Sequence, residues 1–298
     1  MFKRLFLFLT VNILVMIAGS FLISVVLNLL GLGPALTAQG INYTSLMVIC
    51  FVWGMAGSFI SLRLSRWIAK RAYGVEIQSP TGRHGQMVMK VHQLAKAAGI
   101  TTMPEVGIYE ANEINAFATG HAKNSSLVAV SSGLLQQMGS DETEAILAHE
   151  ISHIANGDMV TMALVQGVVN AFVMFFAQLA TIALDNVMRG DNDNGRGMGF
   201  FMRHMVYMFF TVIFGILASP IVMGFSRWRE YHADAGSAKL AGKDKMIRAL
   251  EALERNYPQL SKAESNQAAF QISAKDGWME LFASHPPLKK RIAALKAL

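Results

Sequence analysis

Long runs of apolar residues, almost free of charge, alternate with polar stretches along this chain. The runs cover residues 5–30, about 43–62, about 160–184 and about 200–225. Each run reaches the roughly 20 residues that an α-helix needs to cross the hydrocarbon core of a bilayer. The pattern therefore predicts a mainly α-helical membrane protein with four transmembrane helices.

Three of these assignments have an alternative. Residues 5–30 follow two basic residues, as the core of a signal peptide would, but they exceed the roughly 7 to 15 apolar residues of such a core. An uncleaved anchor is therefore favoured. The third run contains Gln166 and Asn170, and the fourth begins near Arg203, so these two runs can also be interpreted as a helical hairpin buried against the soluble part.

Basic residues beside the apolar runs indicate which side of the membrane the soluble parts face. Lys3 and Arg4 precede the first run. Further basic residues follow the second and fourth runs: Arg63, Arg66, Lys70, Arg71, Arg227 and Arg229. Short loops rich in Lys and Arg stay in the cytoplasm. Both termini and the soluble stretches are therefore expected on the cytoplasmic side.

The apolar runs divide the soluble part into two stretches, which we expect to fold together as one domain because neither is large. The predicted organisation is two transmembrane helices in 1–71, the first part of the soluble domain in 72–158, a transmembrane hairpin in 159–225 and the second part of the domain in 226–298.

Short patterns within these stretches predict an α+β domain. Helical spacing of apolar residues favours a helix that ends at Gly99 and helices in 243–255 and 286–298. The segments EVGIYEA and SLVAVSSGLL are rich in β-branched and aromatic residues, as strands are. They predict a small antiparallel sheet, with Asn115–Thr119 as a further edge strand.

Composition narrows the classes of function. Hydrophobic residues make up 53% of the 298 residues and charged residues 15%, which agrees with a membrane protein. The net charge is +6, but the basic residues lie beside the apolar runs and are not interleaved with stacking aromatics, so no nucleic-acid partner is expected. The single cysteine, Cys50, excludes an intramolecular disulfide and a cysteine-based zinc site.

The segment AILAHEISHIANGD is predicted to lie in a helix over residues 142–155. Asp141 and Glu144 have the spacing of a capping box, which starts a helix, and Asn156 and Gly157 are residues that end one. The helix contains the pattern HExxH.

This pattern predicts a metal centre. His149 and His153 are one helical turn apart, so both imidazoles can bind one ion, and Glu150 projects close enough to act on water at that ion. A catalytic zinc ion commonly has three protein ligands, so a third is needed. Residues 154–203 contain no histidine, and the third ligand must therefore come from a distant segment.

The best source of that ligand is SRWREYHADAGSAKL. Glu230 and Asp234 are four residues apart on a predicted helix, so Glu230 can bind the ion while Asp234 orients a ligand imidazole. His232 points off this face. For Glu230 taken alone, a surface ion pair with Arg227 or Arg229 is the alternative.

Four segments, NAFATG, HEISHIANGD, REYHADAGSAKL and SHPPLKKRI, together resemble the HtpX family of bacterial membrane zinc metalloproteases, which are related to the CAAX prenyl proteases. The resemblance extends over essentially the whole chain and departs from the family at Ser284, where relatives often have threonine. It implies an endopeptidase of the bacterial inner membrane that acts on misfolded or damaged membrane proteins and is associated with stress.

The resemblance also implies the metal and the reacting groups. His149, His153 and Glu230 are expected to bind one Zn²⁺ per chain, and Glu150 is expected to be the catalytic base. His285 is expected to lie near the reaction centre. From its neighbours alone, His285 can also be interpreted as a residue that precedes a helix, because two prolines follow it.

Residues Asn115, Ala116 and Phe117 are implied to form a strand that pairs with the substrate. An edge strand beside the metal can bind an extended peptide by adding it to the sheet. For Asn115 a simple turn residue is the alternative.

We therefore expect a zinc metalloendopeptidase whose partners are the lipid bilayer and membrane or unfolded polypeptides. Two alternatives stay open: a membrane scaffold or transporter that binds metal without hydrolysis, and an enzyme that processes prenylated peptides. The intact Glu150 argues against the first, because a purely structural metal site needs no base. The sequence does not indicate the oligomeric state.

Overall fold

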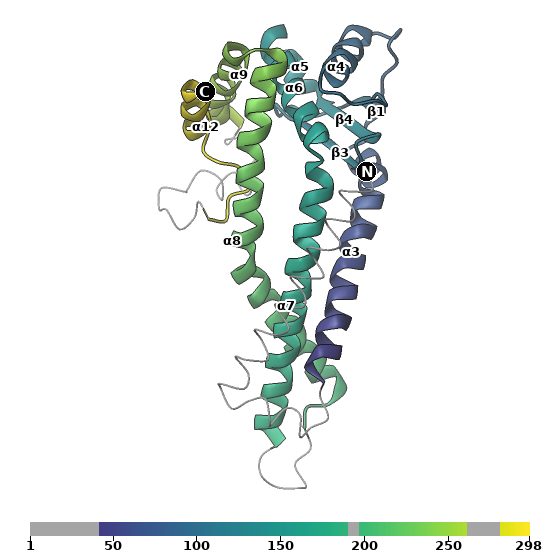
Figure 1. Ribbon diagram of the computed structural model, residues 1–298, viewed down its shortest axis with the longest axis vertical. Helices are drawn as coiled ribbons and strands as arrows, with labels where there is room; N and C mark the ends of the chain where they lie inside the picture. The colour runs from purple at the N-terminus through teal and green to yellow at the C-terminus, as the bar shows by residue number, and fades with distance from the viewer. Residues whose placement is uncertain (1–41, 190–196, 261–280) are drawn as a thin grey trace. The chain divides into compact units, whose positions relative to one another are not determined.

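The computed structural model describes residues 42–189, 197–260 and 281–298, and Figure 1 shows their helices and strands. The transmembrane helix predicted at residues 5–30 lies outside the described residues. The chain divides into two compact units. The helical unit comprises the residues up to Phe59 and Leu164–Ser219, and the mixed unit comprises Ile60–Ala163 and Pro220–Leu298.

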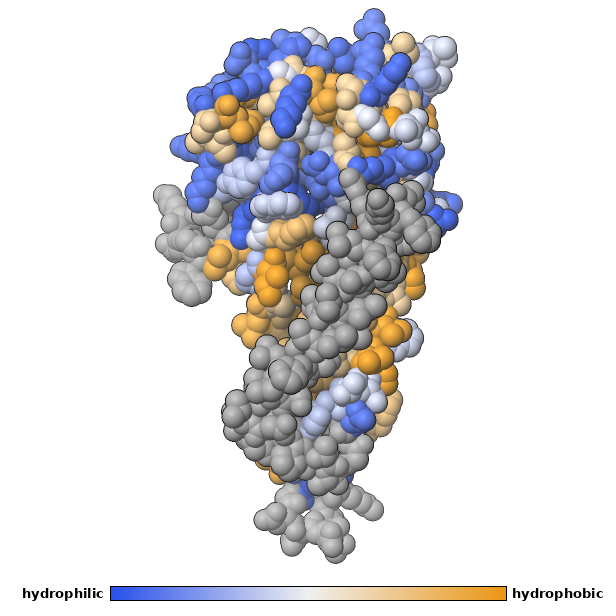
Figure 2. Space-filling model, viewed as in Figure 1, coloured by the Kyte–Doolittle hydropathy of each residue, from blue (hydrophilic) through white to orange (hydrophobic). Residues whose placement is uncertain are grey.

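Three helices among the described residues are long and apolar enough to cross a membrane. They are α3 (Tyr43–Ala72), α7 (Asp158–Arg189) and α8 (Phe200–Ala241). These helices contain the second, third and fourth apolar runs, so helices at those positions are confirmed. Little of the apolar stretch of α7 or α8 is buried, which favours membrane spans over a buried hairpin. The coloured atoms along the apolar helices in Figure 2 are mostly orange, the colour of hydrophobic residues.

Small residues let α3 and α7 approach each other closely in the helical unit. A Cβ atom at Gly54 would lie 2.8 Å from the backbone nitrogen of Ala171 and 2.8 Å from the carbonyl oxygen of Gly167. Nearby, Cys50 is buried against apolar side chains that include Phe175 of α7. Any side chain at Gly54 would therefore push the two helices apart.

The mixed unit contains a four-stranded sheet in the order β1-β2-β4-β3. Its strands are β1 (Glu76–Ile77), β2 (Glu105–Tyr109), β3 (Ala116–Ala122) and β4 (Ser125–Ser131). Strands β1 and β3 are antiparallel to their neighbours, but β2 and β4 are parallel. The prediction of an antiparallel sheet was therefore wrong for this pair. After β2 the chain forms β3 at the sheet edge before returning as β4, and this crossover makes β4 run the same way as β2.

Among the described residues, five shorter helices also belong to the mixed unit. They are α4 (Gly85–Ala97), α5 (Ser132–Gln137), α6 (Ser140–Asn156), α9 (Lys243–Leu260) and α12 (Leu288–Ala297). One hydrophobic core joins the sheet to α4, α6, α9 and α12, and the buried side chains of Leu147, Ile151 and Ile154 put α6 at its centre. The predicted helices before Gly99, in 243–255 and in 286–298 are confirmed.

Helix α6 begins two residues earlier than predicted, with a different cap. The backbone N–H of Gly139 donates to the Glu142 carboxylate at 2.7 Å, so Glu142, not Glu144, closes the first turn. Glu144 instead forms an ion pair with Lys245 of α9 at 2.7 Å, and this hydrogen bond holds the pKa of Glu144 below its usual range. The predicted end is confirmed, because Gly157 has a φ of 76° in the left-handed region.

Candidate metal centre

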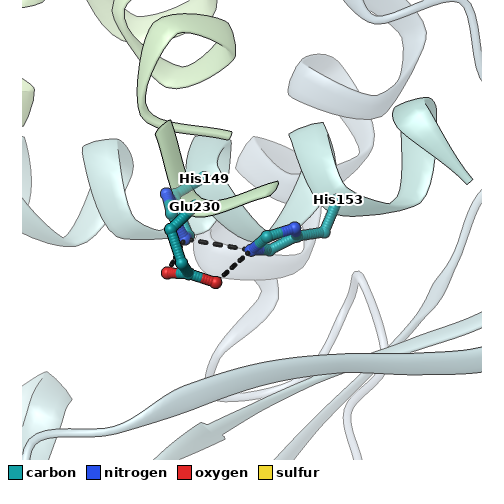
Figure 3. A group of neighbouring side chains, drawn as sticks. All are labelled: His149, His153 and Glu230. Atoms are coloured by element: carbon teal, nitrogen blue, oxygen red, sulfur yellow. Dashed lines mark hydrogen bonds and ion pairs between the residues drawn. The ribbon is translucent and has the colours of Figure 1, made fainter. Parts of the chain in front are cut away.

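Three side chains from two distant segments converge in the mixed unit. His149 and His153 extend from the same side of α6, with their Nε2 atoms 3.1 Å apart (Figure 3). Glu230 of α8 faces both of them. Its Oε2 atom is 3.5 Å from Nε2 of His149, and its Oε1 atom is 3.3 Å from Nε2 of His153.

These three side chains fit a bound metal ion. Tetrahedral zinc with bonds of about 2.0–2.1 Å to nitrogen and oxygen holds its ligand atoms about 3.3 Å apart. The two Nε2 atoms are near this separation, and each lies at a similar distance from one of the two carboxylate oxygens of Glu230. Within the described residues, no other cluster of His, Cys, Asp and Glu has this arrangement. Glu230 is only 2% exposed, and a carboxylate buried so deeply needs positive charge beside it.

Carboxylates orient both imidazoles. Nδ1 of His149 lies 2.9 Å from Asp234, as the i, i+4 spacing on α8 predicted, although this contact lacks the angle of a hydrogen bond. Nδ1 of His153 pairs with Asp158 at 2.6 Å. A carboxylate on the second ring nitrogen fixes the orientation of an imidazole and leaves Nε2 free to bind the ion.

The charge of these carboxylates favours cations at the centre. Burial lowers the pKa of His153, but Asp158 and Glu230 outweigh burial and raise it to about 9. The negative charge of these carboxylates also attracts a metal ion, so it supports metal binding at the Nε2 atoms. Glu150, next to His149 on α6, is also buried.

Arg291, which was not predicted from the sequence, is buried and contacts two carboxylates of the centre. Arg291 of α12 donates to both oxygens of Asp234, from Nε at 2.8 Å and from Nη2 at 2.6 Å. Its Nη1 atom is 3.5 Å from Glu230. Arg291 is spaced with Leu288 and Leu295 on the buried side of its helix, and that spacing is the signal that would have identified it.

The structure brings His285 to the same centre and keeps His232 away from it. Nδ1 of His285 is 2.9 Å from Oε2 of Glu230, while most of the His285 side chain is exposed. Nδ1 of His232 instead contacts the backbone oxygen of Trp228 at 3.0 Å. His285 is therefore placed where it can meet both the metal ligand and a bound molecule.

Residues 115–117 lie at the sheet edge next to α6. Ala116 and Phe117 begin β3, which pairs with β4 and with no other described strand. Asn115 directly precedes β3, and its carbonyl accepts a hydrogen bond from Ser131 at 2.9 Å. The predicted edge strand is confirmed, and the backbone of Asn115 extends its ladder, which argues against an isolated turn.

Known proteins resemble this chain over its full length. The profile of peptidase family M48 matches residues 82–298. The chain is 47% identical to a protease HtpX homolog of Bacillus licheniformis, 48% to protease HtpX of Tolumonas auensis and 49% to protease HtpX of Aeromonas hydrophila, over 99% of each chain in every pair. The crystal structure of S. mikatae Ste24p has a similar fold, with a TM-score of 0.57 and 19% identity over 97% of this chain and 66% of that one.

Proposed function

The chain belongs to peptidase family M48 as a membrane metalloprotease of the HtpX type, and we propose that it uses zinc to cleave misfolded or damaged polypeptides in the bacterial inner membrane. The observation that carries this proposal is the convergence of His149, His153 and Glu230 beside Glu150. The relatives are proteases, and they give no support to a metal-binding scaffold or transporter.

The residues of the centre divide the reaction between them. A zinc ion held by His149, His153 and Glu230 would polarise the scissile carbonyl and make water nucleophilic near neutral pH. Glu150 accepts the proton of the attacking water and returns it to the leaving amine. His285, next to Glu230, donates a hydrogen bond to the negative oxygen that develops on the carbonyl.

The open edge of β3 aligns the substrate. Its free backbone groups form hydrogen bonds with an extended peptide, which holds the peptide in a strand conformation. A folded protein does not offer such a segment, so the site acts on unfolded or damaged chains. The basic residues that follow the spanning helices support a location of the site on the cytoplasmic side.

The test compares purified full-length wild type with Glu150→Gln in detergent, using fluorescent casein and a destabilised membrane protein as substrates. Wild type is expected to cleave both, to lose activity in a chelator and to regain it with zinc. The variant is expected to retain one zinc ion per chain and to be at least about 100-fold slower, because only the base is removed. Undiminished cleavage by protease-free Glu150→Gln would refute the role of Glu150. A farnesylated peptide, cleaved in preference to casein, would favour the prenyl-peptide alternative.

A further inference from the structure

Three aromatic side chains meet on the face of the sheet opposite α6: Tyr73 follows α3, Tyr109 lies on β2, and Phe117 lies on the edge strand β3. The rings of Tyr73, Tyr109 and Phe117 lie with their centroids 5.2 to 5.7 Å apart, and we call them the aromatic cluster. Tyr109 is buried, Phe117 is partly exposed, and Tyr73 is 53% exposed. The exposed parts of Tyr73 and Phe117 therefore form an accessible apolar surface, and Phe117 lies on the strand that aligns the substrate.

The ladder of β3 determines which backbone groups are free at this edge. The carbonyl of Asn115 binds Ser131 of the neighbouring β4, so the polar backbone groups of Asn115 point toward β4. The direction alternates along an antiparallel strand. The groups of Phe117 therefore also point toward β4, while those of Ala116 and Ala118 point to the open edge. A peptide at this edge forms its hydrogen bonds with Ala116 and Ala118.

The side chains of β3 alternate between the two faces of the sheet. Ala116 and Ala118 pack on the core beneath α6, the helix that provides two metal ligands. Phe117 packs on the opposite face, against the cluster that contains Tyr109. In an antiparallel pair, directly opposite residues project to the same face with Cβ atoms about 4.5 to 5.5 Å apart. The peptide residue opposite Phe117 therefore meets the aromatic cluster.

The chemistry of this contact favours one class of side chain. Aromatic rings gain contact area and ring packing from a large apolar partner. A charged side chain there would lose water without gaining a partner of opposite charge. An acidic side chain is opposed further, because burial and the nearby carboxylate of Glu113 raise the pKa of Tyr109 and would disfavour a second negative charge beside it.

We propose that the aromatic cluster is a specificity site, which requires a large apolar residue at the substrate position opposite Phe117. This inference rests on the proposed protease function and deepens it. Large apolar residues are normally buried in folded proteins or in the bilayer. The requirement therefore directs cleavage to segments that have lost this protection.

Quenched fluorescent peptides that differ at one position test the assignment. Phe, Leu, Ala or Asp is placed at each position around the cleaved bond, and kcat/KM is measured with zinc-loaded full-length enzyme in detergent. At the substrate position that lies opposite Phe117, the kcat/KM of wild type is expected to be roughly tenfold or more higher for Phe than for Asp. Contacts in a binding pocket contribute discrimination of this size. Phe117→Ala is expected to reduce this ratio to about twofold at unchanged zinc content.

Two further variants keep the test decisive. Phe117→Leu retains an apolar side chain, so it preserves folding if Phe117→Ala does not, and it is expected to lower the Phe to Leu ratio. Met89→Ala removes an exposed apolar side chain from α4 and is expected to keep the wild-type profile. Wild-type cleavage without side-chain preference, or unchanged ratios in both Phe117 variants, would overturn the specificity site and leave the protease function intact. Failure of zinc-loaded wild type to cleave any peptide would overturn the proposed function and this site with it.

Discussion

Arg291 connects the C-terminal helix to the metal centre through a pair of hydrogen bonds. It binds both oxygens of Asp234 and is itself only 7% exposed. Buried carboxylates without a cation are unfavourable, so Arg291 compensates Asp234 and the nearby Glu230 at once. Because Asp234 in turn faces His149, the position of the guanidinium fixes the position of a metal ligand. Lysine, a point charge without a planar fork, does not reproduce this geometry.

Arg291→Lys is therefore expected to weaken zinc binding about tenfold or more, which is typical of lost partners behind metal ligands. The affinity is measured by competition with a coloured chelator, in a Glu150→Gln background that prevents self-cleavage. Lys289→Met, which removes an exposed charge from the same helix, is the control and is expected to bind zinc like its parent. Equal zinc affinities of the Glu150→Gln parent and of the two variants made in it would contradict the positioning role of Arg291.

The residues of the centre differ in how far sequence spacing could identify them. His149 with His153 and Glu230 with Asp234 were predictable, because four residues along a helix always place two side chains on one face. Asp158 was missed because its contact with His153 requires the turn at Gly157. Arg291 lies in a lysine-rich segment that suggests a solvated surface, and only its spacing with Leu288 and Leu295 indicates burial.

At the scale of elements, the approach of α8 to α6 assembles the ligand set. The hydroxyl of Ser237 donates to the carbonyl of Ala145 at 2.7 Å, and Gly236 faces Ser152. A Cβ atom at Gly236 would lie 2.7 Å from the Cβ of Ser152, closer than two carbon atoms can approach. The missing side chain at Gly236 therefore allows Glu230 on the same helix to reach the two histidines.

Gly236→Ala is expected to lower stability by about 1–3 kcal/mol through overpacking, and to weaken zinc binding as α8 shifts. Gly224→Ala on the same helix is the matched control, since a Cβ there meets only the end of the Arg227 side chain at 3.6 Å. Alanine should stabilise that position by up to about 1 kcal/mol, as in other helices. Thermal unfolding in detergent and zinc titration provide the comparison; equal behaviour of the two variants would refute the close-approach argument.

At the scale of elements, the sequence did not predict how the strands pair or how α6 is capped. Most helices and strands were predictable from periodicity, but β1 was not predicted, and the second half of SLVAVSSGLL forms α5 instead of continuing the strand. The parallel pairing of β2 and β4 was not predictable either. Strand order depends on which edge β3 occupies, and this is decided by packing against α6 and not by local pattern. The cap of α6 shows the same limit, because Glu144 has a better partner in Lys245 of α9.

At the scale of the whole molecule, the chain passes between two units several times. The mixed unit takes its metal ligands from α6, which precedes α7, and from the last part of α8, which follows α7. Four membrane passes, one of them outside the described residues, would return both termini to the same side. From the basic residues after the second and fourth apolar runs we predict that this side is the cytoplasm.

A reporter fused after Leu298 is accordingly expected to behave as cytoplasmic. Green fluorescent protein at this position should fluoresce, and alkaline phosphatase, which needs the oxidising periplasm, should be inactive. The same reporters placed in the loop between α7 and α8 should give the opposite result. Active phosphatase at the C-terminus would overturn either the number of spans or their orientation.

The central claim is that His149, His153 and Glu230 bind one zinc ion on which peptide cleavage depends. Its most direct test is the zinc content of purified Glu150→Gln protein, with and without Glu230→Gln added. We predict about one zinc ion per chain in the single variant and a content close to zero in the double variant, after equal dialysis against a weak chelator. One zinc ion per chain in both proteins would contradict the ligand set.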